Sequence, residues 1–443
     1  MRDLLLGRPV SDVDLAVEGD CVRFCEDFAR HCSARMVSVG QAFQSFRVIR
    51  EGEQLDFASL QGNSLHEDLR RRDITINAMA LPLSALHPED GLLDPCRGQR
   101  DLRGKTVRMV RAQNLADDPL RLLRVFRFAA ELEFRIHPLT LASVRVRAGM
   151  IRPVPGERVF PELKRVLSAG HTAQLVRDMA EHRLLFELVP ELERTVSVSQ
   201  NRYHHLGVWD HTLLALEKAD AILEHPDRYF PGHGPSFRTY LGKPGRSSLL
   251  RLAILLHDVA KPRTRTRQAD GRITFYGHET EGARMTDMIT KRMKASRAEG
   301  QRLARLVRHH LKVQQLRNVA PRRSTLARLV REMKDDILGL LIVGLADLTS
   351  KKGPARSAEA ESAYLELATR ILDVRNLLEA SEKTVRPLVT GRDLMEAFSL
   401  RPSARLGAAL EALRDAVDDG TVTTKEEALE FARLFLADTQ NSL

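Results

Sequence analysis

The spacing of hydrophobic and polar residues changes along the chain. Before about residue 95, apolar and polar residues often alternate with the period of two that is typical of strands. Runs at 46–50 and 55–59 flank a polar turn, which predicts a β-hairpin. Beyond about residue 105, apolar residues recur every three or four positions, as in 120–134 and 250–260. We therefore predict an α/β head followed by almost entirely helical structure.

The chain of 443 residues is longer than a typical domain with one hydrophobic core. Changes in composition indicate where the chain divides. The predicted parts are a head at 1–104, a helical neck at 105–195, a helical bundle at 196–352 and a helical tail at 353–443. Glycine, proline and serine cluster at 231–248, which predicts a surface excursion within the third part.

The strand expected at 10–17 carries two carboxylates, Asp12 and Asp14, which share one face because alternate residues of a strand point the same way. The apolar residues beside them face the core: Val13, Leu15 and Val17. Asp56, on the second strand of the hairpin, is the candidate for a third carboxylate. Ionised carboxylates this close repel one another unless a cation lies between them, and a pair of Mg²⁺ ions suits them. The alternative is a solvated Asp-x-Asp pair on an edge strand.

The net charge of +10 comes mainly from arginine, whose planar guanidinium binds phosphate with two hydrogen bonds. This excess favours a polyanionic partner. The four cysteines have neither paired spacing nor matching histidines, which indicates reduced thiols without zinc. We find neither an apolar run of membrane-spanning length nor the apolar core of a signal peptide, so we expect a cytoplasmic protein without membrane association.

Four segments stand out in order along the first two parts. They are Arg2–Gly7 followed by Asp12-Val-Asp14, LRRRDITINAMA at 69–80, ADDPLRLLRVFRFAA at 116–130 and GERVFPELKRVL at 156–167. In this order they resemble the motifs of the class II tRNA nucleotidyltransferase and poly(A) polymerase family, and residues 391–413 are similar to its tRNA-contacting tail. The resemblance implies a polymerase-β-like nucleotidyltransferase that adds CMP and AMP, from CTP and ATP, to the 3′ end of tRNA.

The resemblance also implies roles for particular residues. Asp12, Asp14 and Asp56 would be catalytic ligands of Mg²⁺. The implied nucleotide-binding residues are Arg2, Asp3, Arg72, Asp73, Asn77, Asp118, Arg121, Arg124 and Arg127.

Among these residues, three sets have a more specific expectation. Asp73 would accept a hydrogen bond from the ribose hydroxyl. Asp118 and Arg121, three residues apart in a helix, would share a face and read the incoming base; an ion pair within that helix is the alternative. Arg124 and Arg127 would either bind phosphate or form a solvated stripe.

Four polar residues interrupt strongly apolar helices in the third part. His257 and Asp258 close the segment LLRLAILLHDVAKP, and His211 and Asp347 lie in equally apolar surroundings. Buried ionisable groups are costly unless they are paired or bound to a metal. A single histidine of this kind is usually an ordinary core or surface residue, but the whole set favours a metal site. Imidazole and carboxylate donors suit Ni, Mn, Co, Fe or Mg.

The order of these histidines and aspartates resembles that of the HD phosphohydrolase superfamily. His278 and the His309-His310 pair fall where its two-metal members place further ligands, and we take His278 and His310 as the candidates. The resemblance implies a metal-dependent phosphohydrolase that would act on 2′,3′-cyclic or terminal phosphates of damaged RNA ends.

Two features depart from the nucleotidyltransferase pattern. The family places a strand ending in Gly-Gly before the segment that here begins at Arg2, so we expect the true start to lie upstream; the alternative is an incomplete nucleotide pocket. The connection between Asp56 and Arg70 is short, as in CC-adding relatives. Three other interpretations therefore stay open: a CC-adding enzyme, an HD phosphohydrolase with a degenerate transferase half, and a non-catalytic tRNA-binding protein. These patterns do not set the oligomeric state.

Overall fold

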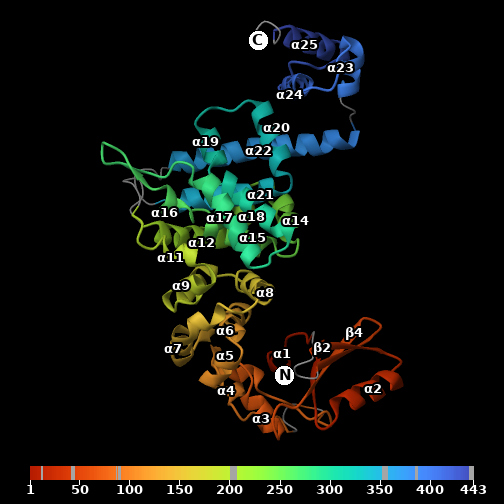
Figure 1. Cartoon of the computed structure of the whole chain (residues 1–443), viewed down its shortest axis with the longest axis vertical. Coiled ribbons are helices and arrows are strands. Elements are labelled where there is room, and N and C mark those ends of the chain that lie inside the picture. The colour runs from red at the N-terminus through yellow and green to blue at the C-terminus, as the bar shows by residue number, and fades with distance from the viewer. Residues whose placement is uncertain are drawn as a thin grey trace. The chain divides into compact units, whose positions relative to one another are not determined.

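The computed structural model describes residues 1–10, 13–40, 45–85, 87, 91–199, 207–351, 358–384 and 388–438. It divides into two compact units, Met1–Pro190 and Glu191–Leu443, which Figure 1 colours from red to blue along the chain. The first unit contains an α/β head and further helices, and the second is almost entirely helical, as predicted. The finer division into four parts stays a prediction.

The head is built on a four-stranded sheet with the strand order β1-β4-β3-β2. Its strands are β1 (Val13–Val17), β2 (Arg35–Gly40), β3 (Ser45–Arg50) and β4 (Glu53–Ser59). β3 and β4 form the predicted hairpin. Both residues of its turn, Glu51 and Gly52, have positive φ, as the two-residue turn that matches strand twist requires. β1 pairs with β4 in parallel.

Helix α2 (Cys21–His31) packs on one face of this sheet (Figure 1). Phe28 of this helix meets Phe57 of β4 with ring centroids 5.2 Å apart, and Val17 is buried beside them. Val13 is 41% exposed at the start of the edge strand β1. The inward position predicted for Val13 is therefore wrong, because the core under the sheet begins further along the strand.

The other elements of the first unit lie before and after the sheet in the sequence. They are α1 (Arg2–Leu5), α3 (Leu65–Arg70), α4 (Gly98–Arg103), β5 (Thr106–Val107), α5 (Ala112–Asp117), α6 (Leu120–Leu132), β6 (Arg135–Ile136), α7 (Pro138–Arg147), α8 (Gly156–Val166), α9 (Thr172–Glu181) and α10 (Leu184–Leu188). The helical pattern predicted at 120–134 forms α6. Its residues Leu122, Val125 and Phe126 are fully buried, and it packs against α8. The four cysteines are free thiols, as predicted.

The second unit is a bundle of helices. Its elements, with α11 at the boundary, are α11 (Pro190–Glu193), α12 (Val208–Glu224), α13 (Pro226–Tyr229), α14 (Gly234–Leu241), α15 (Arg246–Leu256), α16 (Lys261–Thr264), β7 (Thr266–Arg267), β8 (Ile273–Thr274), α17 (His278–Arg292), α18 (Arg297–His309), α19 (Lys312–Arg317), α20 (Arg323–Met333), α21 (Asp336–Ser350), α22 (Ala358–Thr384), α23 (Gly391–Phe398), α24 (Ala404–Asp418) and α25 (Lys425–Asp438). α21 is buried along its whole length, and α12, α15 and α18 pack around it. The segment 231–248, predicted as a surface excursion, contains α14, which buries Phe237 and Tyr240, whereas residues 242–245 are exposed. Within the described ranges, no helix is long and apolar enough to cross a membrane.

One buried carboxylate ties three of these helices together. Asp336, at the start of α21, accepts hydrogen bonds from Arg246 of α15 and Arg302 of α18, both at 2.6 Å, and also pairs with Arg305 of α18. Its side chain is only 2% exposed, so the arginines replace the water that the carboxylate loses. This junction fixes how α15, α18 and α21 are held against one another.

Replacing Asp336 should destabilise the bundle, because Arg246 is also buried and would lose its counter-charge. We expect Asp336→Asn to lower the free energy of unfolding by about 3 kcal/mol, measured by urea denaturation. The matched control is Asp287→Asn: Asp287 pairs with Lys291 on α17, where the two side chains are 44% and 76% exposed, and such pairs contribute at most about 1 kcal/mol. Equal losses in the two variants would show that the buried network does not stabilise the bundle.

Candidate active sites

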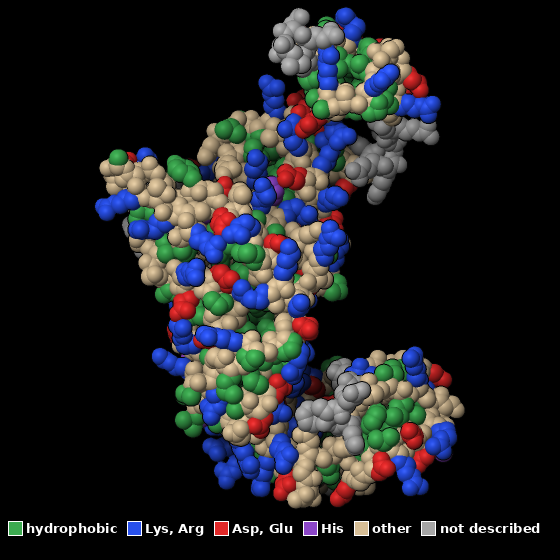
Figure 2. All heavy atoms as spheres, in the orientation of Figure 1, with side chains coloured by type: hydrophobic (Ala, Val, Ile, Leu, Met, Phe, Trp, Pro, Cys, Tyr) green, Lys and Arg blue, Asp and Glu red, His purple; other side chains and the backbone are tan. Residues whose placement is uncertain are grey.

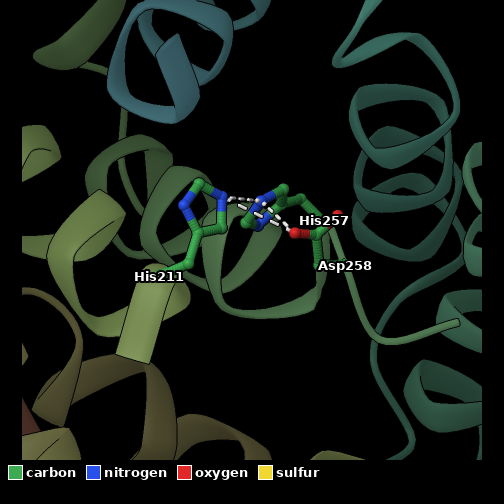
Figure 3. Close-up of side chains that lie close together, drawn as sticks. All are labelled: His211, His257 and Asp258. Carbon is green, nitrogen blue, oxygen red and sulfur yellow. Dashed lines mark hydrogen bonds and ion pairs between the residues drawn. The ribbon is translucent and has the colours of Figure 1, made fainter. Parts of the chain in front are cut away.

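Six residues of the second unit converge in one buried cluster. They are His211 on α12, His257 and Asp258 after α15, His278 at the start of α17, His310 after α18 and Asp347 on α21. These are the residues for which the sequence predicts metal binding in this unit, and the bundle brings all of them together. Figure 3 shows His211, His257 and Asp258 pointing toward one another.

The Nε2 atoms of the histidines face one another in pairs. The Nε2 atoms of His257 and His211 are 3.3 Å apart, and those of His278 and His310 are 3.4 Å apart. In His257, His278 and His310, Nδ1 donates to the backbone carbonyl three residues earlier, at 2.7 to 2.8 Å. In His211, Nδ1 donates to the hydroxyl of Ser350, whose own hydrogen goes to a backbone carbonyl. Each neutral ring therefore turns a lone pair inward at Nε2.

Two carboxylates lie among these lone pairs. Oδ2 of Asp258 is 3.1 Å from Nε2 of His257, and Oδ1 of Asp347 is 3.0 Å from Nε2 of His211. Such groups repel one another unless a cation lies between them. Burial acts to lower the pKa of His257, but the charge of Asp258 outweighs it and raises that pKa above its usual value. The ammonium group of Lys261 is a positive partner of Asp258, because its Nζ lies 2.7 Å from Oδ2 of that carboxylate.

The cluster fits a divalent metal. Two sets of residues each offer three donor atoms within 4.8 Å of one another: His211, His257 and Asp258, and Asp258, His278 and His310. Asp258 belongs to both sets and would contribute a carboxylate to either. Donation from the other ring nitrogen to a backbone carbonyl is the usual support of a histidine ligand, and imidazole with carboxylate suits several divalent metals.

A cavity of about 810 Å³ opens onto the cluster. Lys261 and Lys351 line it beside Asp258 and Asp347. Lys351 Nζ lies 3.2 Å from Oδ2 of Asp347, and Gln314 donates to the same oxygen at 2.6 Å. The sequence analysis missed these supporting residues. A signal existed for the lysines, which follow the two aspartates by three and four positions, about one helical turn; none existed for Gln314.

Two of the three carboxylates predicted on the head, Asp14 and Asp56, lie on the sheet face opposite α2. Asp14 of β1 and Asp56 of β4 occupy the same register on neighbouring parallel strands, so their side chains leave the same face one strand spacing apart. Asp12 lies outside the described residues. Arg47 of β3 stands opposite Asp56 and donates two hydrogen bonds to it, at 2.6 and 2.7 Å. The sequence analysis missed Arg47, although the register of a hairpin with a two-residue turn would have revealed it.

Several predicted nucleotide-binding residues form one hydrogen-bonded network. Asp73 is buried and accepts from Arg124 at 2.8 Å, from Asn77 at 3.3 Å and from the next backbone N–H. Arg2 donates to the amide oxygen of Asn77 at 3.0 Å. Burial acts to raise the pKa of Asp73, but the charge of Arg124 and these hydrogen bonds outweigh it and lower the pKa. Arg72 pairs with Asp68 of α3, with 2.9 Å between Nη2 and Oδ2.

Three guanidinium groups surround the ring of Phe128 on α6. The central carbons of Arg2, Arg124 and Arg127 lie 5.1, 5.5 and 4.1 Å from the ring centroid. Each guanidinium has its own carboxylate partner: Asp3 for Arg2, Asp73 for Arg124 and Glu162 for Arg127. The solvated stripe considered for Arg124 and Arg127 is therefore wrong, because both arginines pack into the helical layer and form ion pairs there.

The pair expected to read the base is arranged differently from the prediction. Asp118 is not helical; it is extended between α5 and α6, because Pro119 follows it and the residue before a proline avoids the helical region. Asp118 accepts from Arg158 of α8 at 3.0 Å. Arg121 donates to the backbone carbonyl of Arg71 at 2.8 Å. The expected shared helical face is wrong, and these partners differ from the intrahelical ion pair considered as the alternative.

Comparison with known proteins assigns this geometry to a family. The family model for the poly A polymerase head domain matches residues 1–108, that for the probable RNA and SrmB- binding site of polymerase A matches 133–195, and that for the HD domain matches 208–351. The A-adding tRNA nucleotidyltransferase of Deinococcus radiodurans is 35% identical over 406 residues, which are 90% of this chain and 85% of the relative. The CC-adding tRNA nucleotidyltransferase of Thermus thermophilus is 31% identical over 438 residues, 97% of this chain and 91% of the relative.

A solved structure described as the complex of a CCA-adding enzyme with ATP has the same fold, with a TM-score of 0.65 at 22% identity over 97% of this chain and 86% of that chain. A sheet with paired carboxylates, a helical layer and a separate histidine–aspartate cluster define a nucleotidyltransferase joined to an HD domain. The chain belongs to the tRNA nucleotidyltransferase family. The family resemblance found in the sequence is thereby confirmed.

A divalent metal should stabilise the second unit, because it removes the repulsion inside the cluster. We expect Ni²⁺, at about 100 times its dissociation constant, to raise the free energy of unfolding by about 2.7 kcal/mol, seen as a higher melting temperature after chelation and readdition. Asp258→Ala removes the shared donor and should abolish this increase. The control, Asp287→Ala, changes an exposed carboxylate on α17 and should keep it. An undiminished increase in Asp258→Ala would exclude the cluster as the binding site.

Proposed function

We propose that the first unit transfers CMP and AMP, from CTP and ATP, to the 3′ end of tRNA. The observation that carries the proposal is the placement of Asp14 and Asp56 at one register of the sheet, within a head that matches its family model over residues 1–108. The relatives are named as tRNA nucleotidyltransferases, and the solved structure with this fold is described as binding ATP.

In this reaction the oxygen of the terminal tRNA hydroxyl bonds to the α-phosphorus of the nucleotide. The bond from that phosphorus to the β-phosphate oxygen breaks, and pyrophosphate leaves. Asp14 and Asp56, together with Asp12, would hold Mg²⁺, which neutralises phosphate charge and favours deprotonation of the hydroxyl. Ionised Asp73 would accept a hydrogen bond from the ribose, and the guanidinium of Arg124 beside it would attract phosphate.

The proposal also covers the selection of the base that is added. We assign it to Asp118 and Arg121, each of which must exchange its present partner, Arg158 or a backbone carbonyl, for the edge of the base. The segment 60–64 that joins β4 to α3 is short. A short connection at this place was the feature of the sequence that resembled CC-adding enzymes. Because the relatives are named separately for adding A and for adding CC, the two additions need separate assays.

Exposed basic residues suit a tRNA partner. Figure 2 shows Lys and Arg side chains over much of the visible face of each unit, with a group of them near α4. The exposed basic residues of α4 and its flanks are Arg97, Arg100, Arg103 and Lys105. We assign the tRNA backbone to this surface, because neutralisation of phosphates supplies most of the affinity for nucleic acid.

The transferase proposal predicts that Asp14→Ala loses nucleotide addition by about 1000-fold or more, since metal stabilisation of the transition state is worth several kcal/mol. The assay supplies labelled CTP to tRNA lacking its CCA end, and labelled ATP to tRNA ending in CC. Asp27→Ala, an exposed change on α2, should keep both activities, and both variants should keep tRNA binding. Undiminished addition by Asp14→Ala would refute the assignment, and a wild-type protein that binds tRNA without adding nucleotides would refute the function.

For the second unit we propose metal-dependent hydrolysis of phosphoesters at RNA ends, such as 2′,3′-cyclic phosphates. The observation that carries it is the convergence of four Nε2 atoms and two carboxylates beside the cavity. A bound divalent metal polarises the phosphoryl group and favours deprotonation of water. The water oxygen bonds to phosphorus, one bond from phosphorus to a ribose oxygen breaks, and that oxygen takes a proton. Lys261 and Lys351 would attract the phosphoryl oxygens.

His257→Ala should remove metal-stimulated hydrolysis of adenosine 2′,3′-cyclic phosphate and leave CMP addition nearly unchanged, because the carboxylates of the head belong to the other unit. The protein is first chelated and then supplied with Ni²⁺, Mn²⁺, Co²⁺ or Mg²⁺. His225→Ala serves as the control, since His225 is an exposed histidine of the same unit. Hydrolysis that persists in His257→Ala, or that responds to none of these metals in the wild type, would remove this function from the cluster.

A further inference from the structure

The cavity beside the metal cluster is larger than a phosphate group requires. Its volume of about 810 Å³ lies within the range of pockets that enclose small organic ligands, roughly 300–1,000 Å³. Residues 270–277, from the β7–β8 hairpin and the turn after it, line it together with Asp258, His310 and Asp347. This segment therefore faces whatever group is attached to the phosphoester.

Tyr276 is the aromatic side chain that this segment exposes most. It is 82% exposed and comes two residues before the predicted ligand His278. Phe275 has Lys261 Nζ 5.5 Å from its ring centroid, and its carbonyl accepts from Nδ1 of His278 at 2.8 Å. Gly277 has φ of +75°, a conformation that favours glycine. The same turn thus buries His278 in the cluster and leaves Tyr276 exposed at the cavity.

The charges that line the cavity also suit a nucleotide. Apart from the predicted ligands, the charged residues that line the cavity are Lys261, Arg272 and Lys351, with Asp270 and Glu279. Asp270 is already paired with Arg272, at 2.6 Å. Arg265 and Arg267 are exposed at the start of the same hairpin. The cavity thus combines an exposed aromatic ring with basic side chains, and single-stranded nucleic acid binds where bases stack on aromatic rings and phosphates pair with cations.

We propose that Tyr276 is the base-binding residue of the phosphoesterase site: the base next to the scissile phosphoester stacks on its ring. The inference rests on the hydrolytic function proposed above and narrows its substrates to nucleotide phosphoesters at an RNA 3′ end. Small phosphoesters without a base are poor substrates. Because every base has a face that can stack, Tyr276 confers preference for a nucleotide without preference for one base.

The kinetic test compares Tyr276→Ala with Tyr276→Phe, which keeps the ring, and with Val319→Ala, a residue that is 68% exposed and does not line the cavity. The substrates are adenosine 2′,3′-cyclic phosphate and glycerol 1,2-cyclic phosphate, which has no base, each supplied with Mn²⁺. We expect Tyr276→Ala to raise KM for the adenosine substrate about 10-fold or more, with kcat and the glycerol substrate unchanged. Equal KM values in all variants would overturn the inference and leave the hydrolytic function standing.

A second measurement does not depend on hydrolysis. An oligoribonucleotide ending in 4-thiouridine is irradiated with the full-length protein in EDTA, and the adduct is located by peptide mass spectrometry. We expect a cross-link on the peptide that contains Tyr276, reduced about 5-fold or more in Tyr276→Ala and kept in Tyr276→Phe and Val319→Ala. A retained cross-link without any metal-stimulated hydrolysis would refute the phosphoesterase proposal alone. Cross-links confined to other segments would refute base binding by Tyr276.

Discussion

Nitrogen lone pairs and carboxylates that are buried away from water need a positive partner. This electrostatic constraint governs the arrangement of the second unit. The Nε2 atoms of His211 and His257 face each other at 3.3 Å among the carboxylates of Asp258 and Asp347. In a medium of low polarity this arrangement is unfavourable without a cation. The side chains are held there nonetheless by apolar burial along α21 and by the hydrogen bonds that the Nδ1 atoms of the histidines donate. Packing therefore imposes a repulsion that a bound cation relieves.

Asp336 meets the same constraint elsewhere in the bundle, and the chain itself satisfies it there. Three arginines surround this carboxylate, which closes the network without a ligand. From this junction, α15 and α18 run to His257 and His310, which cap their C-terminal ends, where the helix dipole adds to the attraction for a cation. The packing thus separates an ion network that is complete within the chain from a cluster that fits a cation, although both use charged or ionisable residues of the same bundle.

In the first unit, arginine supplies the positive charge that buried carboxylates need. Arg124 pairs with Asp73 and Arg127 with Glu162, so the residues that resemble a nucleotide site also join the helical layer to the segment at 70–77. Asp14 and Asp56 leave the sheet face opposite α2, where Arg47 pairs with Asp56. The two units therefore differ: the first places a partly exposed carboxylate pair on a sheet, and the second forms a buried cluster by helix packing.

Local patterns in the sequence were enough to predict the α/β head, the hairpin, the helices after it and four residues of the buried cluster, because strand period, turn chemistry and polar residues on apolar helices are all signals of short range. His278 and His310 were predicted only through the resemblance to the HD phosphohydrolase superfamily. The pattern misplaced Asp118, since helical spacing alone did not account for the effect of Pro119. No local pattern pairs Arg124 with Asp73, which are 51 positions apart, or turns the Nε2 atoms of histidines from different helices toward one another. These contacts depend on how helices pack, and packing sums many long-range interactions that no single stretch of sequence contains.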